Sequence, residues 1–268
     1  MTSHPLRGMK MQTFDYLFIT GCARSGTSVM ANLLRSHPEI AMGRERFSFR
    51  YSGKRDFPSC LFEKERFCRQ LLPGDSHHER LDAYYEELHA RIDQCAYRGD
   101  KIPEMACAYA PLLAAYDRPK VIYMLRNIFD VASSFKLRAS RARENKMTAG
   151  WPWDRGSAAA VAEWSLSLRN TLEVLDRIQV HFVVYERLFE SAVEIDTLFG
   201  FLNLQITEPV NSMHEGMMGK YRELELAREV SLTSPEKLHI MQSADFESYR
   251  RALRVADSAI RPPEAQAR

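Results

Sequence analysis

The sequence predicts a single α/β domain spanning residues 1–268, with a central, mainly parallel sheet and helices on both faces. One observation is the segment 16–34, where aromatic and β-branched residues give way to a small glycine-containing loop and then to apolar residues at helical spacing. The other is the near-continuous apolar run at 121–125, which is typical of a strand buried on both faces of a parallel sheet. The ends, 1–13 and 261–268, are expected to be flexible tails.

The loop after the first strand reads G-C-A-R-S-G-T-S at residues 21–28. Gly21 and Gly26 free its backbone, and the helix that follows directs consecutive N–H groups toward an anion, so the loop predicts a phosphate cradle and a P-loop type of fold. Nucleoside triphosphatases place a lysine where Thr27 stands, whereas the positive charge here is Arg24 inside the loop. This departure favours a ligand with a single anionic group at its 5′ end. A strand-to-helix turn that binds nothing is the alternative.

The helix after the loop is expected to end near 36–38, because proline disfavours helix at the residue before it. A short apolar piece at 40–42 then leads to Glu45, whose plain interpretation is a surface carboxylate paired with neighbouring arginines. The elements expected next are a loop at 47–58, helices at 59–72 and 75–97, a turn at 98–103 that carries Lys101, and a short helix at 106–116.

Arg126 follows the apolar strand at 121–125 and therefore lies at the carboxyl edge, where open α/β sheets bind ligands. The next helix returns Ser134 to the same edge about two turns later. Nucleoside triphosphatases usually have a magnesium-binding aspartate at such a strand end. The positively charged Arg126 in this place instead favours a second anionic group on the ligand. Arg24 in one loop and Arg126 with Ser134 at another strand end predict a ligand with two separated anionic groups.

The C-terminal half continues the alternation of helix and strand. An aromatic loop at 150–153 contains Trp151 and Trp153, which could stack on a sugar or an apolar acceptor or could pack the loop onto the core. The loops at 47–58 and 139–156 are expected to select the acceptor, whose identity the sequence does not indicate. A helix at 157–177 and a strand at 179–184 follow. The last helical part is expected at 235–255.

Composition limits the kinds of molecule that the protein could bind and the compartment in which it is expected. A net charge of +2 and a pI near 8.2 are too mild to indicate nucleic acid binding. No segment is long and apolar enough for stable membrane insertion, and the N-terminus lacks an apolar export signal, so a cytoplasmic protein is expected. The five cysteines form no C-x-x-C pair, which favours free thiols over disulfides or a metal site. The oligomeric state is not indicated.

Together these motifs resemble the sulfotransferases that use 3′-phosphoadenosine 5′-phosphosulfate (PAPS), especially a bacterial branch with the loop G-x-x-R-S-G-T-[ST]. The resemblance runs from about residue 16 to 204. The matching segments are the loop at 21–28, the S-H-P-E-I run at 36–40, the G-D-K-I-P turn at 99–103, Arg126 with Ser134, and the V-Y-E-R-L segment at 184–188. The basic run at 219–222 is similar to the segment that closes over PAPS in this family.

The resemblance implies sulfuryl transfer from PAPS to a hydroxyl or amine of a glycan or another small acceptor, without a metal. The released product would be adenosine 3′,5′-bisphosphate (PAP). The residues that it implies for PAPS binding are Cys22, Ala23, Arg24, Ser25, Gly26, Thr27, Ser28, Arg126, Ser134, Tyr185 and Lys220. Of these, Arg126 and Ser134 match the arginine and serine that bind the 3′-phosphate in the family.

The same resemblance implies a catalytic set of Glu45, Arg24 and Lys101. Glu45 occupies the place of the glutamate base, with His37 or Lys101 as alternative bases. Arg24 is expected to stabilise charge on the leaving group, because a guanidinium does not release a proton at ordinary pH. A magnesium-dependent P-loop kinase or nucleotidase and a non-catalytic nucleotide-binding protein stay open as other classes.

Overall fold

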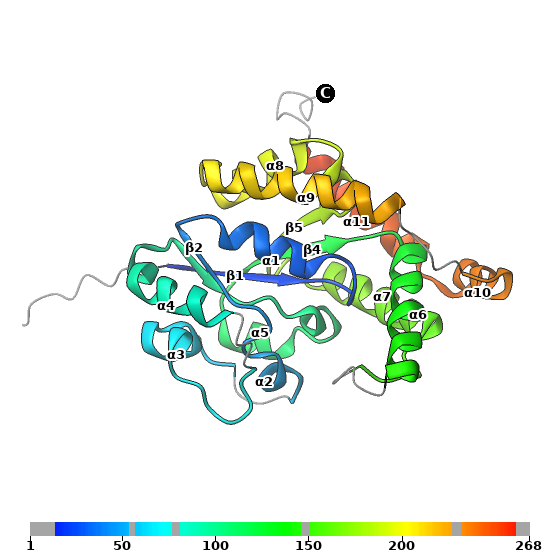
Figure 1. Cartoon of the computed structure of the whole chain (residues 1–268), viewed down its shortest axis with the longest axis horizontal. Coiled ribbons are helices and arrows are strands. Elements are labelled where there is room, and N and C mark those ends of the chain that lie inside the picture. Colours follow the sequence, from blue (N-terminus) through cyan, green and yellow to red (C-terminus); the bar gives the residue numbers. More distant parts are fainter. Residues whose placement is uncertain (1–13, 54–56, 77–80, 146–150, 227–231, 261–268) are drawn as a thin grey trace, which may run out of the picture.

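The computed structural model describes residues 14–53, 57–76, 81–145, 151–226 and 232–260, so both expected tails lie outside the described residues. Within these ranges five strands form one sheet in the order β2-β3-β1-β4-β5 (Figure 1). Every pairing in it is parallel, which confirms the predicted fold class. The strands are β1 (Asp15–Thr20), β2 (Ile40–Met42), β3 (Tyr97–Gly99), β4 (Lys120–Leu125) and β5 (Gln179–Val184).

Helices surround this sheet. The α-helices in the described part are α1 (Thr27–Arg35), α2 (Ser48–Ser52), α3 (Lys64–Cys68), α4 (Asp82–Arg91), α5 (Ala110–Ala115), α6 (Ile128–Asn145), α7 (Ser157–Glu173), α8 (Val193–Leu202), α9 (Glu208–Leu226), α10 (Ser234–Ser243) and α11 (Phe246–Ile260). The 3-10 helices are η1 (Ser59–Phe62), η3 (Ile92–Gln94), η4 (Pro103–Cys107) and η5 (Arg187–Phe189).

Side chains along β1 alternate between two hydrophobic cores. Leu17 and Ile19 pack on the face covered by α1, α8 and α9, which lie on one side of the sheet in Figure 1. Phe18 points to the opposite face, where its ring meets those of Phe57 and Tyr116 at 5.8 and 5.2 Å between centroids. Because helices cover both faces of the sheet, the strands consist of nearly continuous apolar residues, as is typical of parallel strands. The sheet edge that carries the loop at 21–28 therefore stands on a rigid base.

The region between β2 and β4 departs from the sequence prediction. The helix expected at 75–97 is only α4, and the chain passes through η3 into β3, which begins inside the expected helix and includes Arg98 of the expected turn. The Arg98 guanidinium is buried and donates to the carbonyls of Phe62 (3.1 Å) and Ile92 (3.0 Å). A three-residue strand built around an arginine has no apolar periodicity, so its pairing with β1 and β2 decides its structure.

The two loops expected to select the acceptor are partly helical. α2 lies inside 47–58, and α6 continues to Asn145, inside 139–156. Trp151 packs on Phe135, with 4.9 Å between ring centroids, so the packing interpretation holds for this ring. Trp153 is 62% exposed. The described parts of these two segments therefore have more regular structure than the sequence indicates.

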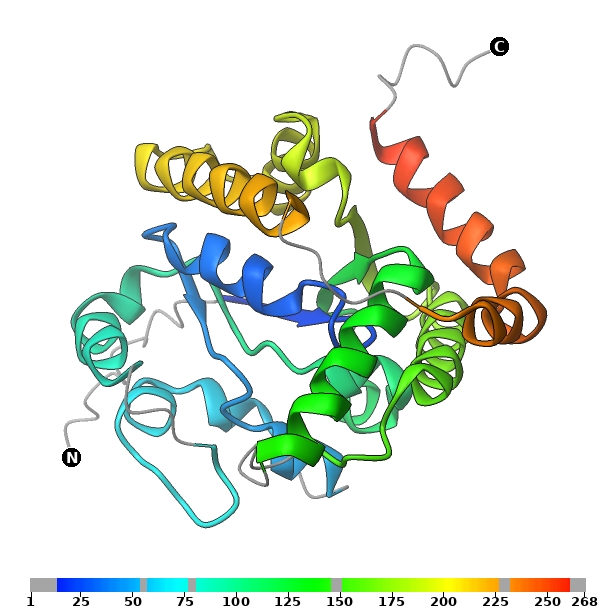
Figure 2. The ribbon, with the colours of Figure 1, turned by 45° about the vertical axis from the view of Figure 1, so that its right-hand side comes forward.

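The single C-terminal helix expected at 235–255 is two helices, α10 and α11, which Figure 2 shows at an angle to each other. The break follows from Asp245, whose carboxylate accepts the N–H of Ser248 (3.0 Å) and so caps α11. The helix expected at 157–177 and the strand at 179–184 are confirmed as α7 and β5.

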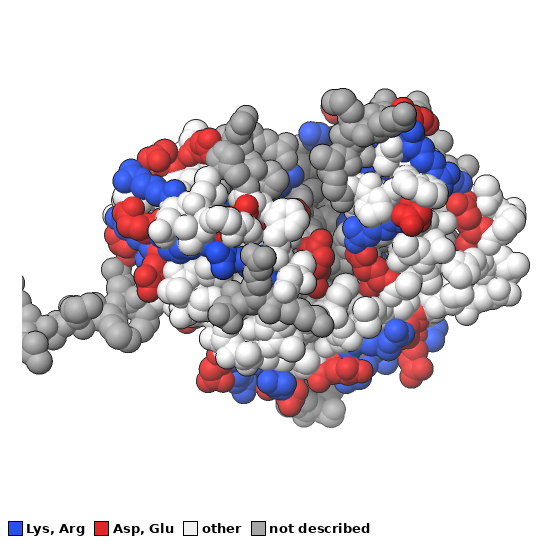
Figure 3. Space-filling view, turned by 90° about the horizontal axis from the view of Figure 1, so that it is seen from below, with Lys and Arg blue, Asp and Glu red and all other residues white. Residues whose placement is uncertain are grey.

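The face seen from below in Figure 3 carries acidic and basic side chains interspersed with each other. None of the helices within the described ranges is long and apolar enough to cross a bilayer.

Candidate active site at the carboxyl edge of the sheet

The loop between β1 and α1 is a compact turn with two positive-φ positions in addition to Gly21. Ser25 is buried, and its backbone N–H and its hydroxyl both donate to the carbonyl of Cys22, at 3.1 and 2.6 Å. Gly26 caps α1 at φ 97°, and a Cβ there would lie 2.3 Å from the ring of Tyr185. Arg24 has φ 68° although it is not a glycine. This conformation costs about 1–3 kcal/mol, and residues strained in this way occur most often at functional sites. Thr27 (buried) and Ser28 (half-buried) begin the helix.

A carboxylate from α7 holds the first half of this loop. Glu163 accepts the backbone N–H of Ala23 (3.1 Å) and lies 3.8 Å from the Cys22 thiol. Arg155 forms an ion pair with the same carboxylate. Burial raises the pKa of Cys22, and Glu163 raises it further, so the thiol stays protonated and acts inside the loop as a donor. A glutamate in the middle of a helix gives no sequence signal for this contact.

The two expected anion sites adjoin each other. Arg24 donates through Nε to the hydroxyl of Ser134 at 3.0 Å, which joins the loop to α6. Arg126 donates through Nη1 to the carbonyl of Arg24 at 3.0 Å, and its guanidinium lies 4.0 Å from the ring centroid of Tyr185. Four of the residues predicted for PAPS binding therefore form one contiguous group.

Positive charge accumulates around this group. Although part of the Arg24 side chain is exposed, the protein around it partly desolvates the guanidinium and lowers its pKa, and the charges of Arg138, Arg126 and Arg141 lower that pKa further. Arg138 and Arg141 follow Ser134 by four and seven residues, which is the spacing of one helix face, so α6 turns both toward the loop. Among the residues that the structure describes, the Nε atoms of Arg126 and Arg138 are buried without a hydrogen-bond partner. A cluster of mutually repelling arginines at a helix N-terminus is suited to a multiply charged anion.

Glu45 and Lys101 meet beside the loop. The Lys101 ammonium forms an ion pair with the Glu45 carboxylate, and the lysine is buried while the glutamate side chain is 39% exposed. Burial lowers the pKa of Lys101, and the charge of Glu45 opposes that shift. The turn that carries Lys101 is tied to the end of β1, because the Thr20 hydroxyl donates to the carbonyl of Pro103 at 3.0 Å. The pair therefore lies at the same sheet edge as the phosphate loop.

Glu104 adds a second, unexpected carboxylate to this corner. It is half-buried, and burial raises its pKa, with a further increase from the charge of Glu45. The charge of Lys101 lowers the pKa of Glu104 and that of Glu163 raises it, so Glu104 interacts electrostatically with both groups. Its Oε2 atom is buried and has no hydrogen-bond partner within the described part of the chain.

His37 lies elsewhere and is structural. Its Nε2 lies 3.0 Å from the carbonyl of Gln205, and its Nδ1 accepts the N–H of Glu39 at 3.1 Å. The ring is buried and packs on Phe199. With both nitrogens engaged away from the loop, His37 is a poor candidate for a base.

Lys220 lies on the exposed side of α9 and lines a groove of about 580 Å³ between α1 and α9, beside Met217. Its neighbour Tyr221 stacks on Phe189 with 4.2 Å between centroids, and that ring packs against Tyr185. The end of α9 thus reaches the loop through aromatic rings, and the role of Lys220 stays a prediction.

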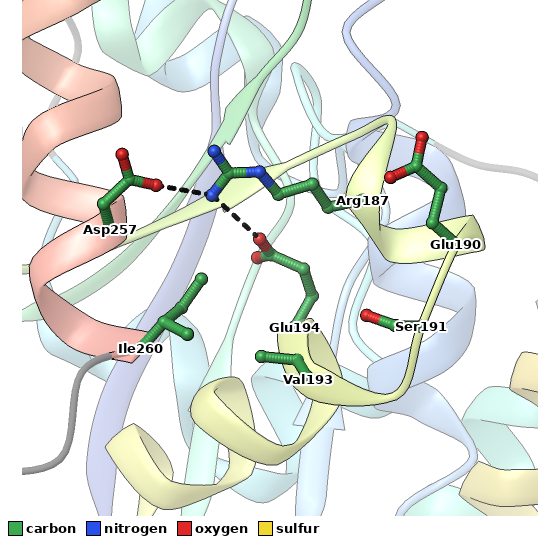
Figure 4. Close-up of a pocket in the computed structure, with 7 residues that line it drawn as sticks. All are labelled: Arg187, Glu190, Ser191, Val193, Glu194, Asp257 and Ile260. Atoms are coloured by element: carbon green, nitrogen blue, oxygen red, sulfur yellow. Dashed lines mark hydrogen bonds and ion pairs between the residues drawn. The ribbon is translucent and has the colours of Figure 1, made fainter.

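A separate pocket of about 440 Å³ lies between η5, α8 and α11. Figure 4 shows Arg187 in it, pointing between the carboxylates of Asp257 and Glu194, which lie 2.7 and 3.9 Å from its Nη1. Because these carboxylates already neutralise the guanidinium, this pocket is less suited to an anion than the loop.

Comparisons with known proteins show which folds and families this chain is similar to. Solved structures with a similar fold include the sulfotransferase domain from the curacin biosynthetic pathway, at 18% identity and TM-score 0.49, which covers 74% of this chain and 77% of that one. A sulfotransferase from Alicyclobacillus acidocaldarius has 18% identity and TM-score 0.47, with 89% and 100% covered. Mouse sulfotransferase SULT7A1, solved with PAP, has 14% identity and TM-score 0.41, with 95% and 86% covered.

No curated protein sequence matches the chain. The family model described as "Sulfotransferase family" matches residues 16–208, which include the loop, the Glu45–Lys101 pair, Arg126 with Ser134, and Tyr185. The match extends over most of the chain, so this protein belongs to the sulfotransferase family and is an enzyme of sulfuryl transfer.

Proposed function

We propose that this sulfotransferase uses PAPS as the donor and transfers its sulfuryl group to a hydroxyl or amine of a glycan or another small-molecule acceptor. The observation that carries the proposal is the convergence of Arg24, Arg126, Arg138 and Arg141 on one loop. PAPS has a 5′-phosphosulfate and a 3′-phosphate, and this cluster offers charge for both. Five free cysteines favour a reducing compartment such as the cytoplasm.

In the proposed reaction Glu45 takes the proton from the acceptor while the acceptor oxygen or nitrogen forms a bond to sulfur. The bond between sulfur and the 5′-phosphate oxygen breaks, and PAP leaves. Arg24 and the backbone N–H groups at the start of α1 stabilise the charge that develops on the leaving phosphate. Lys101 orients the carboxylate of Glu45 through their ion pair. As in phosphoryl transfer, catalysis consists of positioning and charge stabilisation.

The test is a thermal-shift comparison of PAP, AMP and ATP, each with and without magnesium. At 100 times its dissociation constant, PAP should raise the melting temperature by about 5–10 °C without magnesium. AMP lacks the 3′-phosphate and should raise it much less. Equal shifts for PAP and AMP, or a shift that needs ATP with magnesium, would favour a kinase or nucleotidase and sink the proposal.

A further inference from the structure

Asp100 lies at the end of β3, directly before Lys101, and its side chain is fully buried. Its Oδ2 accepts the backbone N–H of Phe47 at 2.8 Å. Its Oδ1 accepts the backbone N–H of Lys101, also at 2.8 Å. One carboxylate therefore binds the backbone of two segments, the loop that carries Glu45 and the turn that carries Lys101.

The space for this carboxylate exists because residue 43 is a glycine. A Cβ at Gly43 would lie 2.6 Å from Oδ1 of Asp100. The two segments also exchange backbone hydrogen bonds, since Glu45 donates its N–H to the carbonyl of Lys101 (2.9 Å) and Gly43 donates to that of Gly99 (2.8 Å). Asp100 thus occupies the centre of a small network beneath the Glu45–Lys101 ion pair.

The network holds Glu45 in an uncommon conformation. Glu45 has φ 57°, in the left-handed region that non-glycine residues rarely adopt. Such a residue persists only where its surroundings fix it, and the Asp100 contacts on the segment after Glu45 do so. Without them, the backbone at Glu45 would relax and its carboxylate would move relative to Lys101.

We propose that Asp100 is a positioning residue for sulfuryl transfer, which fixes the Glu45–Lys101 pair by accepting the N–H groups of Phe47 and Lys101. The inference rests on the proposed function, in which Glu45 takes the acceptor's proton. Asp100 itself is sealed from solvent and touches no reacting atom.

The positioning depends on charge, because a carboxylate accepts through both oxygens whereas a carboxylic acid has one weaker acceptor. Burial raises the pKa of Asp100 to about 7, although the N–H groups of Phe47 and Arg46 and the charge of Lys101 lower it, and Glu45 raises it again. Tyr85 of α4 is a further titratable side chain that interacts with it. Asp100 is therefore about half ionised near pH 7, so positioning strengthens as the pH rises above that value and weakens as the pH falls below it.

The test measures kcat for PAPS hydrolysis to PAP, with water as the acceptor, in the full chain. Asp100→Asn should lower kcat roughly 10-fold to 100-fold, because a misplaced base loses effectiveness steeply with distance. The KM for PAPS should change less than about three-fold, since the variant leaves the phosphate loop intact. Asp93→Asn, a surface carboxylate before β3, is the matched control and should behave as wild type.

A pH profile and a double mutant separate positioning from a general structural effect. Wild-type kcat should rise with pH around 7, and Asp100→Asn should be flat between about pH 6 and pH 8, because an amide does not titrate there. Glu45→Gln alone should lose roughly 10² to 10⁴ in kcat. Adding Asp100→Asn to it should change kcat by less than about two-fold, because the two residues act as one unit.

Different outcomes overturn different statements. If Glu45→Gln keeps wild-type kcat, the proposed base is wrong. If Glu45→Gln is inactive while Asp100→Asn keeps wild-type kcat, or if the two losses multiply, Asp100 does not act through Glu45. Should Asp100→Asn fail to fold, Gly43→Ala displaces the same carboxylate without removing its charge, and near-normal kcat in that variant would overturn the inference.

Discussion

Arg126 connects the phosphate loop to the aromatic ring of Tyr185, and it is the residue expected to bind the 3′-phosphate. Arg126→Ala removes a charge-assisted contact worth on the order of 1.5–3 kcal/mol, so the affinity for PAP should fall about ten-fold or more. AMP has no 3′-phosphate, and its affinity should change little. Titration calorimetry with both ligands measures the difference.

Arg143→Ala is the matched control, because this arginine also lies on α6 but its guanidinium stacks over Trp153. It should leave both affinities unchanged. Equal weakening of PAP and AMP by Arg126→Ala would mean that the guanidinium supports the loop through the carbonyl of Arg24 instead of binding the 3′-phosphate.

At the scale of elements, Glu236 is the polar contact that joins α10 to α6, beside the buried Ile240 of the same helix. Its carboxylate closes a capping box with Thr233 and forms an ion pair with Lys136 of α6 at 2.7 Å. Partial burial would raise the pKa of Glu236, but Lys136 and Thr233 outweigh it and lower the pKa to about 2. A carboxylate with a depressed pKa stabilises the fold above its ordinary value of 4.5, and this contribution is lost as the pH falls toward 2.

Glu236→Gln should therefore lower the free energy of unfolding by about 1–2 kcal/mol at neutral pH. Urea unfolding at a series of pH values measures it, and the gap to wild type should close as the pH falls from 4.5. Glu247→Gln, an exposed first-turn residue of α11, is the control. A gap that stays constant with pH would show that the ionised carboxylate is not what attaches the helix.

At the scale of the whole molecule, acid stability depends on His181 in the central part of β5. Its ring is buried and stacks on Phe201, and burial lowers its pKa from 6.5 to about 4. The unfolded chain takes up this proton near pH 6.5 and the folded one only near pH 4, so stability is lost as the pH falls through that window. His181→Phe keeps a flat ring and should remove this loss.

The difference in the free energy of unfolding between the wild type and His181→Phe should change by at most about 1.4 kcal/mol for each pH unit below 6.5. Thermal unfolding of both proteins from neutral to mildly acidic pH measures it. The comparison is needed because Asp100, with its pKa raised to about 7, contributes in the opposite sense over the same window and flattens the wild-type curve. Parallel curves for the two proteins would mean that His181 is protonated in the folded state.

The strands with long apolar runs were predictable from sequence. The apolar residues of β1, β4 and α7 form patterns within each segment itself. The burial of residues such as Phe18 and Trp164 can therefore be predicted without knowing which element packs against them. β3 does not, because it has three residues, one of which is Arg98, and its structure depends on pairing with β1 and β2. β3 was therefore missed because long-range pairing defines it, whereas the break between α10 and α11 follows from the local contact of Asp245 with Ser248.

The residues of the candidate site also differ in how well the sequence identifies them. The loop residues and Arg126 were identifiable because a glycine pattern and a strand end mark them. Glu163 and Asp100 were not, since their roles follow from hydrogen bonds to backbone groups 140 and 53 residues away in the chain. Arg138 had a usable signal, since it lies one helical turn after Ser134.

Arg24 and Glu45, the two residues with the most direct proposed roles in chemistry, are both non-glycine residues at positive φ. Any selection that rewards thermal resistance alone will favour replacing them by glycine or asparagine, which tolerate this backbone better. Such replacements would raise the thermal stability of the protein and lower its turnover rate, while the fold stays the same. A stabilised library should therefore hold positions 24 and 45 constant and seek its gains elsewhere.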